Sequence, residues 1–153
     1  IVVIEHLYRQ GTRLKTQVEE VIRRHGLSDF VKILGRPCCL AYVTLDQDGR
    51  PSQAFRTLLL QETIRRGVLM PSLVVSYSHT DVDIDITVAA IEQALEVYRR
   101  ALEDGVEYYL IGRPSQTVYR RYNIREERSD RPDGSSQDAT HDRAAESSGR
   151  INA

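Results

Sequence analysis

The strongest constraint on the fold is a helical repeat of apolar residues between Thr80 and Gly105. The residues of one face recur at alternating spacings of four and three: Ile84, Val88, Ile91, Leu95, Tyr98 and Leu102. This period predicts an amphipathic helix with a single buried stripe. Thr80 followed three residues later by Asp83 predicts a capping box at its start, and Gly105 predicts its end.

Two further segments show a helical period. In the first, the repeating positions are Leu7, Gly11, Leu14, Val18, Val21 and Ile22. Gly26 predicts the end of that helix. The second is predicted to begin at the N-cap Ser52 and to end at Gly67. Its expected inner face carries Phe55, Leu58, Leu59 and Glu62.

Short apolar runs between these helices predict strands. They are Val31–Leu34, Leu40–Leu45, Val68–Met70, Leu73–Tyr77 and Tyr108–Ile111. Gly35-Arg36-Pro37 separates the first two runs, and Asp46-Gln47-Asp48-Gly49 predicts a turn after the second. Helices that alternate with short strands indicate an α+β fold. We expect a small antiparallel-type sheet with about three helices on one face.

Composition divides the chain near Ile124. Residues 1–124 carry the apolar patterns, whereas residues 125–153 contain four alanines and Ile151 as their only apolar residues. A segment so poor in apolar side chains is expected to form a disordered polar tail. The chain begins within a helical pattern, with Ile1, Val2, Val3 and Ile4. We therefore expect residues 1–124 to be a domain without its beginning, and these four side chains to lack part of their packing.

Charge and cysteine content exclude several classes of function. The formal net charge of −1 gives no basic footprint for nucleic acid. No apolar run approaches the roughly 20 residues that span a bilayer, so no membrane partner is expected. Cys38 and Cys39 are adjacent and are expected to be reduced, half-buried thiols in a strand, which weakly favours a cytoplasmic location.

An apparent calcium loop is better explained as the start of a helix. Asp81, Asp83, Asp85 and Glu92 occupy positions 1, 3, 5 and 12 of the loop pattern, but Ile86 replaces the required glycine at position 6. Acidic residues in a first helical turn already complement the helix dipole. We therefore predict no metal site.

Two other patterns favour structural roles. Gly-Arg-Pro occurs at 35–37, 49–51 and 112–114 without surrounding basic residues, which indicates turns and not DNA hooks. Ser76, Ser78, His79 and Asp81 are the residue types of a hydrolytic triad, but they lie almost consecutively in the sequence. His79 is expected at a helix start or a pocket rim. His6, His25 and His141 are expected as isolated surface residues.

Two longer stretches resemble a known family. Residues 52–71, SQAFRTLLLQETIRRGVLMP, look like the carboxy-terminal domain of class III pyridoxal-phosphate aminotransferases. Residues 76–85, SYSHTDVDID, are similar to the Ser-x-Ala-His-Thr-x-x-Asp-Ile-Asp segment of the glutamate-1-semialdehyde aminomutase branch. The resemblance covers about residues 3–123 and ends at 118–123, VYRRYN.

The resemblance implies the small domain of a fold-type I homodimeric enzyme, whose large domain carries the pyridoxal 5'-phosphate. Lys15 and Lys32 are the only lysines, and neither has a context that would activate it as a Schiff-base nucleophile. Neither matches the family's lysine motif, so we expect no catalytic or cofactor-binding residue and no bound cofactor in this chain. The resemblance places Ser72, Ser76 and His79 on the pocket side. The large domain is the expected partner, and the chain alone is expected to be inactive.

Two departures leave the substrate open between an aminomutase and a transaminase. Residues 71–75, PSLVV, replace the longer Phe-Glu-Ala-Gly-Phe stretch of the aminomutases, and its glutamate is absent. No arginine lies between Arg66 and Arg99 to clamp a substrate carboxylate as in other class III transaminases. A different class of function also stays open, namely a free-standing α+β regulatory module that binds a ligand or a partner.

Overall fold

The computed structural model describes residues 2–116. This part of the chain is α+β, with three α-helices and a two-stranded antiparallel sheet. In chain order the elements are α1 (Val2–Arg24), β1 (Val31–Arg36), β2 (Cys39–Thr44), α2 (Gln53–Arg65), α3 (Asp81–Asp104) and the 3-10 helix η1 (Val106–Tyr108). The predicted boundary at residue 124, the predicted tail and His141 lie outside the described residues.

The helix boundaries confirm the predicted caps. Ser52 precedes α2, and its hydroxyl accepts a hydrogen bond from the Phe55 amide at 3.3 Å. The Thr80 hydroxyl accepts one from the Asp83 amide at 3.4 Å, and the Asp83 carboxylate accepts the Thr80 amide at 2.7 Å. These paired bonds satisfy amide groups that the first helical turn leaves without partners.

The sheet is a single hairpin. Its register pairs Val31 with Thr44 and Arg36 with Cys39, so Pro37 and Cys38 form the two-residue turn. Both cysteines are free thiols: Cys38 is half-buried as predicted but lies in the turn, and Cys39 lies in β2 and is exposed.

The other three predicted strands are wrong. Leu73 makes one isolated antiparallel bridge to Leu40, and the remainder of residues 68–77 forms no strand. Tyr108 ends η1 instead of beginning a strand. The physical reason is that side chains take the main-chain hydrogen bonds of these segments, as described below for Met70 and Pro71. Pro71 itself has no amide hydrogen to donate to a ladder.

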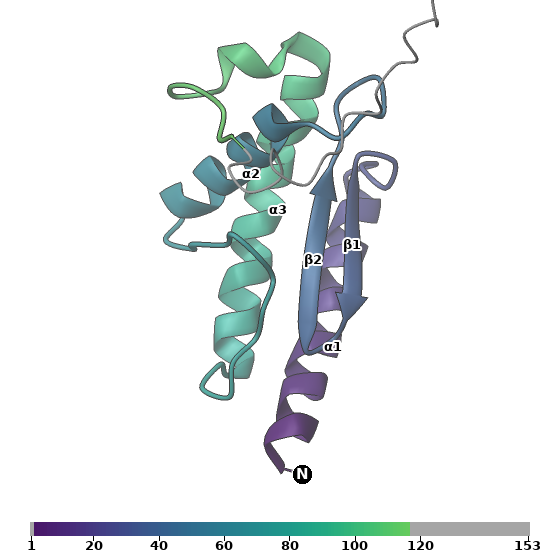
Figure 1. Cartoon of the computed structure of the whole chain (residues 1–153), viewed down its shortest axis with the longest axis vertical. Coiled ribbons are helices and arrows are strands. Elements are labelled where there is room, and N and C mark those ends of the chain that lie inside the picture. Colours follow the sequence, from purple (N-terminus) through teal and green to yellow (C-terminus); the bar gives the residue numbers. More distant parts are fainter. Residues whose placement is uncertain (1, 117–153) are drawn as a thin grey trace, which may run out of the picture. The chain divides into compact units, whose positions relative to one another are not determined.

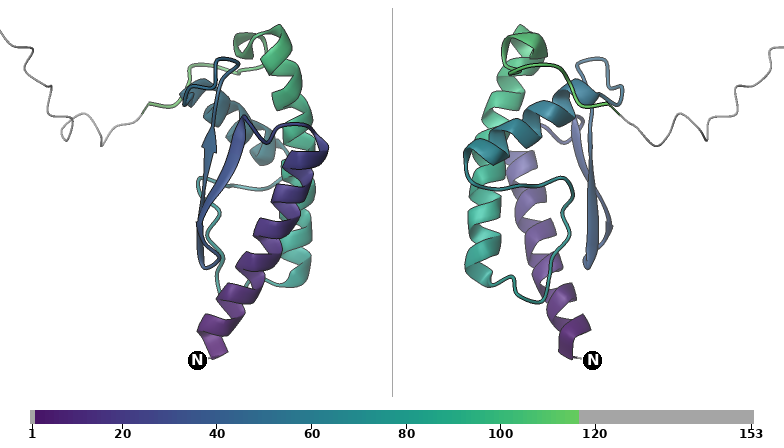
Figure 2. Two further views of the ribbon diagram at one scale, coloured as in Figure 1. Left: turned by 90° about the vertical axis from the view of Figure 1, so that its right-hand side faces the viewer. Right: turned by 60° about the vertical axis from the view of Figure 1, so that its left-hand side comes forward.

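The hairpin and the long helices form two layers. Figure 1 shows the hairpin beside α1, and both views in Figure 2 place α1 and α3 together with the hairpin to one side. α1 contacts both strands, α2 contacts β2, and α3 packs against α1 and α2. The structure thus has three helices and a two-stranded antiparallel sheet, in line with the predicted α+β class. The core lies between these elements, where the rings of Phe55 and Tyr98 are 4.6 Å apart.

A close contact joins α1 to the tip of the hairpin. Gly11 is buried on the inner face of α1, and a Cβ atom built there would lie 1.7 Å from the carbonyl oxygen of Pro37. Only a glycine lets the two backbones approach this closely. The predicted exposure at the start of α1 is confirmed for Val2, Val3 and Ile4; Ile1 lies outside the described residues.

None of the helices between residues 2 and 116 combines the length and apolar character that a membrane crossing requires.

Candidate functional site

A cavity of about 280 Å³ lies between α1, the segment that joins α2 to α3, and the first turns of α3. Its apolar walls include Leu14, Met70, Leu73, Val75 and Ile84. Polar side chains reach it from Ser72, His79, Asp83 and Thr87. A concave surface that combines apolar walls with convergent polar groups can bind a small molecule.

Side chains from β2 and α2 fix the connecting segment that walls the cavity. The buried Tyr42 hydroxyl donates a hydrogen bond to the Met70 carbonyl at 2.9 Å, and Arg56 donates one to the Pro71 carbonyl at 2.7 Å. The Arg56 guanidinium also lies 4.6 Å from the centre of the Tyr42 ring. Met70, Leu73 and Val75 are thereby held as buried side chains.

His79 lies in a tight turn with one ring nitrogen already engaged. The Ser76 amide donates a hydrogen bond to His79 Nδ1 at 3.1 Å, and the His79 amide donates to the Ser76 carbonyl at 3.2 Å. Since Nδ1 accepts, a neutral His79 carries its proton on Nε2. His79 therefore offers a hydrogen-bond donor on a ring that lines the cavity.

His6 of α1 supports this turn. Its Nε2 donates a hydrogen bond to the His79 carbonyl at 3.1 Å, and its ring meets the Tyr77 ring edge-on at 5.0 Å. The prediction that His6 is an isolated surface residue was therefore wrong. Nor is His25 isolated, since its largely covered ring lies 3.7 Å from Glu92. Both contacts join residues that are far apart in the sequence, so no local pattern reveals them.

The acidic residues of the apparent calcium loop pair with α1. Arg13 binds the Asp85 carboxylate at 2.8 Å and lies 3.2 Å from Asp81, which also accepts a hydrogen bond from Gln10 at 2.8 Å. The Gln10 hydrogen bond and the Arg13 charge lower the pKa of Asp81. α3 runs through the whole segment, as the apolar period predicted.

The structure brings together two of the three predicted pocket residues. Ser72 and His79 line the cavity, whereas Ser76 does not, and its hydroxyl lies 2.9 Å from that of Ser78. Sequence reasoning did not identify Asp83 and Thr87 as lining residues. Asp83 was explained by its capping role, which leaves no separate signal for a position in a cavity wall.

The described residues do not fit a site for covalently held pyridoxal phosphate. The Lys15 ammonium lies 3.8 Å from Glu19 on α1, and Lys32 is exposed on β1. Neither lysine lines the cavity. The cavity can offer apolar contact and hydrogen bonds to a bound molecule, but no amine.

Comparisons with family models, with curated proteins and with solved structures gave no match to this chain.

Proposed function

We propose that this chain is the carboxy-terminal small domain of a class III transaminase or aminomutase that depends on pyridoxal phosphate. One observation carries the proposal: residues 76–85, one of the two segments that resemble the family, are also the turn and helix start that place His79 at the cavity.

In this role the chain supplies a wall of the substrate pocket. Its apolar residues offer contact surface, and the His79 ring and the Ser72 hydroxyl offer hydrogen bonds to an amino/keto or aldehyde substrate. The cofactor, bound to a large domain that is the partner of this one, would supply the amino-group chemistry. The proposal includes a fold-type I homodimer, a cytoplasmic setting that keeps Cys38 and Cys39 reduced, and an inactive isolated chain.

The first test is the coding sequence upstream of Ile1. We expect it to encode, in frame, a cofactor-binding domain with its own lysine. An upstream region that encodes no such domain would contradict the proposal.

A chemical test uses the 153-residue chain with pyridoxal phosphate and borohydride. We expect no stoichiometric labelling, since Lys15 is paired and Lys32 is solvated. Labelling of one of these lysines at one cofactor per chain, mapped by peptide mass spectrometry, would show that the chain holds the cofactor itself.

A free-standing ligand-binding module is the second candidate, because the chain has a concave surface lined by both apolar and polar residues. Sedimentation, thermal melting and dye binding separate the two. A domain that has lost its partner should bind a hydrophobic dye and self-associate through Val2, Val3 and Ile4, which are exposed. A compact monomer that melts cooperatively and binds no dye favours the module.

A further inference from the structure

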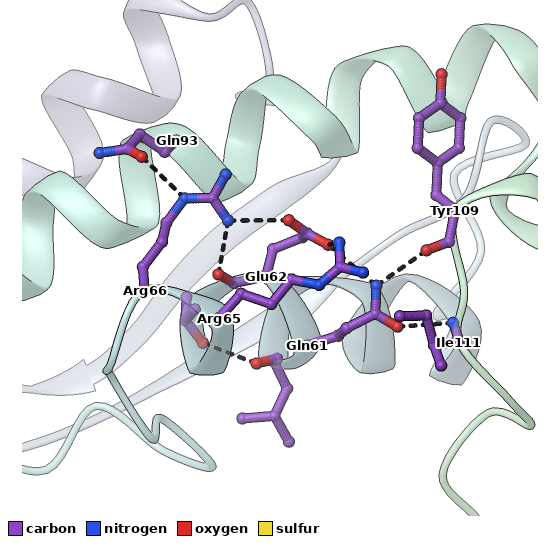
Figure 3. Close-up of polar contacts among 9 residues, drawn as sticks. Gln61, Glu62, Arg65, Arg66, Gln93, Tyr109 and Ile111 are labelled. Atoms are coloured by element: carbon purple, nitrogen blue, oxygen red, sulfur yellow. Dashed lines mark hydrogen bonds and ion pairs between the residues drawn. The ribbon is translucent and has the colours of Figure 1, made fainter.

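Residues 109–115 run past α2 and are held there by side chains of the helix. Within the described residues this segment belongs to no strand. Gln61 contacts it at Tyr109 and Ile111, and Thr57 contacts it at Ser115 (Figure 3 shows the Gln61 end). Because Thr57 and Gln61 are four residues apart, they share one face of the helix.

Gln61 binds the main chain of the segment with both the NH₂ group and the oxygen of its side-chain amide. Its Nε2 donates a hydrogen bond to the Tyr109 carbonyl at 2.9 Å, and its Oε1 accepts one from the Ile111 amide at 2.8 Å. A residue of a neighbouring parallel strand makes the same pair of bonds, to residues two apart on its partner. The side chain thus replaces a strand neighbour.

The orientation of this amide is fixed by a buried carboxylate. The Gln61 Nε2 also donates to Glu62 Oε1 at 3.0 Å. The Glu62 side chain is 3% exposed and is held by Arg65 at 2.7 Å and Arg66 at 2.9 Å. Arg66 is in turn bound to Gln93 of α3 at 3.0 Å (Figure 3). Turning the amide over would set its NH₂ group against the Ile111 amide and its oxygen against Glu62, so only one orientation satisfies every partner.

Thr57 binds the other end of the segment through its hydroxyl group. Its hydroxyl donates its hydrogen to the Gln53 carbonyl at 2.7 Å. It must then accept both contacts from Ser115, the amide at 2.9 Å and the hydroxyl at 2.9 Å, because a hydroxyl has one hydrogen and two acceptor positions. Both anchors therefore have a fixed donor and acceptor pattern.

The segment presents its main chain to α2 and most of its side chains to solvent. Ile111 is 71% exposed, Gly112 and Arg113 are exposed, and Leu110 is half-buried against the core. The third Gly-Arg-Pro tripeptide, at 112–114, spans the gap between the two anchors. The backbone of the segment is turned, with Tyr109 in the αR region and Gly112 at a φ of +87°. Recognition at this face therefore depends on this main-chain conformation more than on side-chain identity.

We propose that the face of α2 with Thr57 and Gln61 is a docking site for the main chain of a segment with the sequence and turned conformation of residues 109–115. The chain fills the site with its own residues 109–115, and a copy of that segment supplied in trans takes the same place when the resident copy is weakened. This inference goes beyond the proposed function and does not depend on it.

The main experiment adds a peptide with the sequence of residues 108–116 to the full-length chain. The Gln61 side-chain NH₂ signals in the NMR spectrum report occupancy. In the unaltered chain, about 1 mM peptide should cause no shift, because a tethered segment has an effective concentration in the millimolar range or above. In the Ile111→Pro chain, which lacks the amide hydrogen that Gln61 accepts, the same peptide should shift these signals. A peptide that itself carries Ile111→Pro should not.

A second measurement on the full-length chain does not require the proline variant to fold. Gln61→Ala should accelerate hydrogen exchange of the Ile111 amide by about tenfold, while the core amides of α3 stay unchanged. Gln53→Ala is the matched control, since Gln53 is on the same helix and exposed; it should leave Ile111 unchanged. The proposal fails if Gln61→Ala has no effect at Ile111, if the whole domain exchanges faster to the same degree, or if the two peptides behave alike.

Discussion

Two segments without strand structure run past α2, and they are held in opposite ways. Residues 68–75 are anchored through two carbonyl oxygens, by Tyr42 and Arg56, and bury three large side chains. Residues 109–115 are anchored through amides as well as a carbonyl, yet leave most side chains in solvent. Hydrogen bonds fix where each segment lies. Apolar burial decides which of them the fold depends on, since one net hydrogen bond contributes about 1 kcal/mol and a buried leucine about 1.5–3 kcal/mol.

The largest expected effect is a direct test of that contrast. Leu73→Ala should lower the free energy of unfolding by about 2–5 kcal/mol, because the side chain is 3% exposed and its removal leaves a cavity. Leu110→Ala should cost much less, because Leu110 is only half-buried. Urea denaturation followed by circular dichroism measures both. Equal losses would show that the two segments belong to one cooperative core.

The next effect concerns Glu62. Burial works to raise its pKa, but hydrogen bonds from Arg66 and Gln61 and the charges of Arg65 and Arg66 outweigh it, so the pKa lies below the ordinary 4.5. The ionised form is thus stabilised by folding. This contribution is complete above the unfolded pKa of about 4.5 and is lost as the pH falls through the lower folded pKa.

Glu62→Gln keeps the shape and removes the charge. We expect it to lower stability by about 1.5–3 kcal/mol at pH 7, the range for a hydrogen bond to a charged group. The difference from the unaltered chain should shrink toward acid pH. Denaturation at several pH values between 7 and 3 measures this difference in stability. A difference that stays constant over this range would mean that the charge of Glu62 does not contribute to stability.

A smaller effect is expected in the first segment. Tyr42→Phe removes the hydroxyl that bonds to the Met70 carbonyl and should cost about 1 kcal/mol, more if that carbonyl finds no water. Chemical denaturation gives the loss, and NMR shifts at Met70 and Leu73 show whether the segment moves. If Tyr42→Phe leaves the stability and these shifts unchanged, burial of side chains alone holds the segment in place.

The smallest effect is expected at a residue that faces outward on the same segment. Leu69 is 74% exposed, so Leu69→Ala should change the free energy of unfolding by less than about 0.5 kcal/mol. The same denaturation measurement checks it. A loss comparable with that of Leu73→Ala would mean that Leu69 contributes to the core despite its exposure.

The same contrast separates what the sequence could predict from what it could not. The α3 helix, its Thr80 cap and the hairpin follow from residues close together in the sequence, and the structure confirms them. The segments at 68–77 and 108–111 have apolar patterns typical of strands. Their main chains are bound instead by Tyr42, Arg56 and Gln61, between 15 and 50 residues away.

The candidate site was predictable to a similar degree. Ser72 and His79 were predicted on the pocket side through the overall family resemblance, and the structure places both in the lining of the cavity. The position of Ser76 could not be foreseen, because its hydroxyl turns toward Ser78. The support from His6 was also hidden, since that contact joins residues 73 apart in the sequence.

The contact between Gly11 and Pro37 sets a dimension of the cavity. Leu14, one turn after Gly11, forms one wall, and Leu73, bridged to Leu40 of the hairpin, belongs to another. The distance between α1 and the hairpin tip therefore depends on the absence of a Cβ atom at position 11. Any side chain at position 11 should push α1 and the hairpin apart and widen the space between Leu14 and Leu73. We therefore expect the width of the cavity to depend on a residue that does not line it.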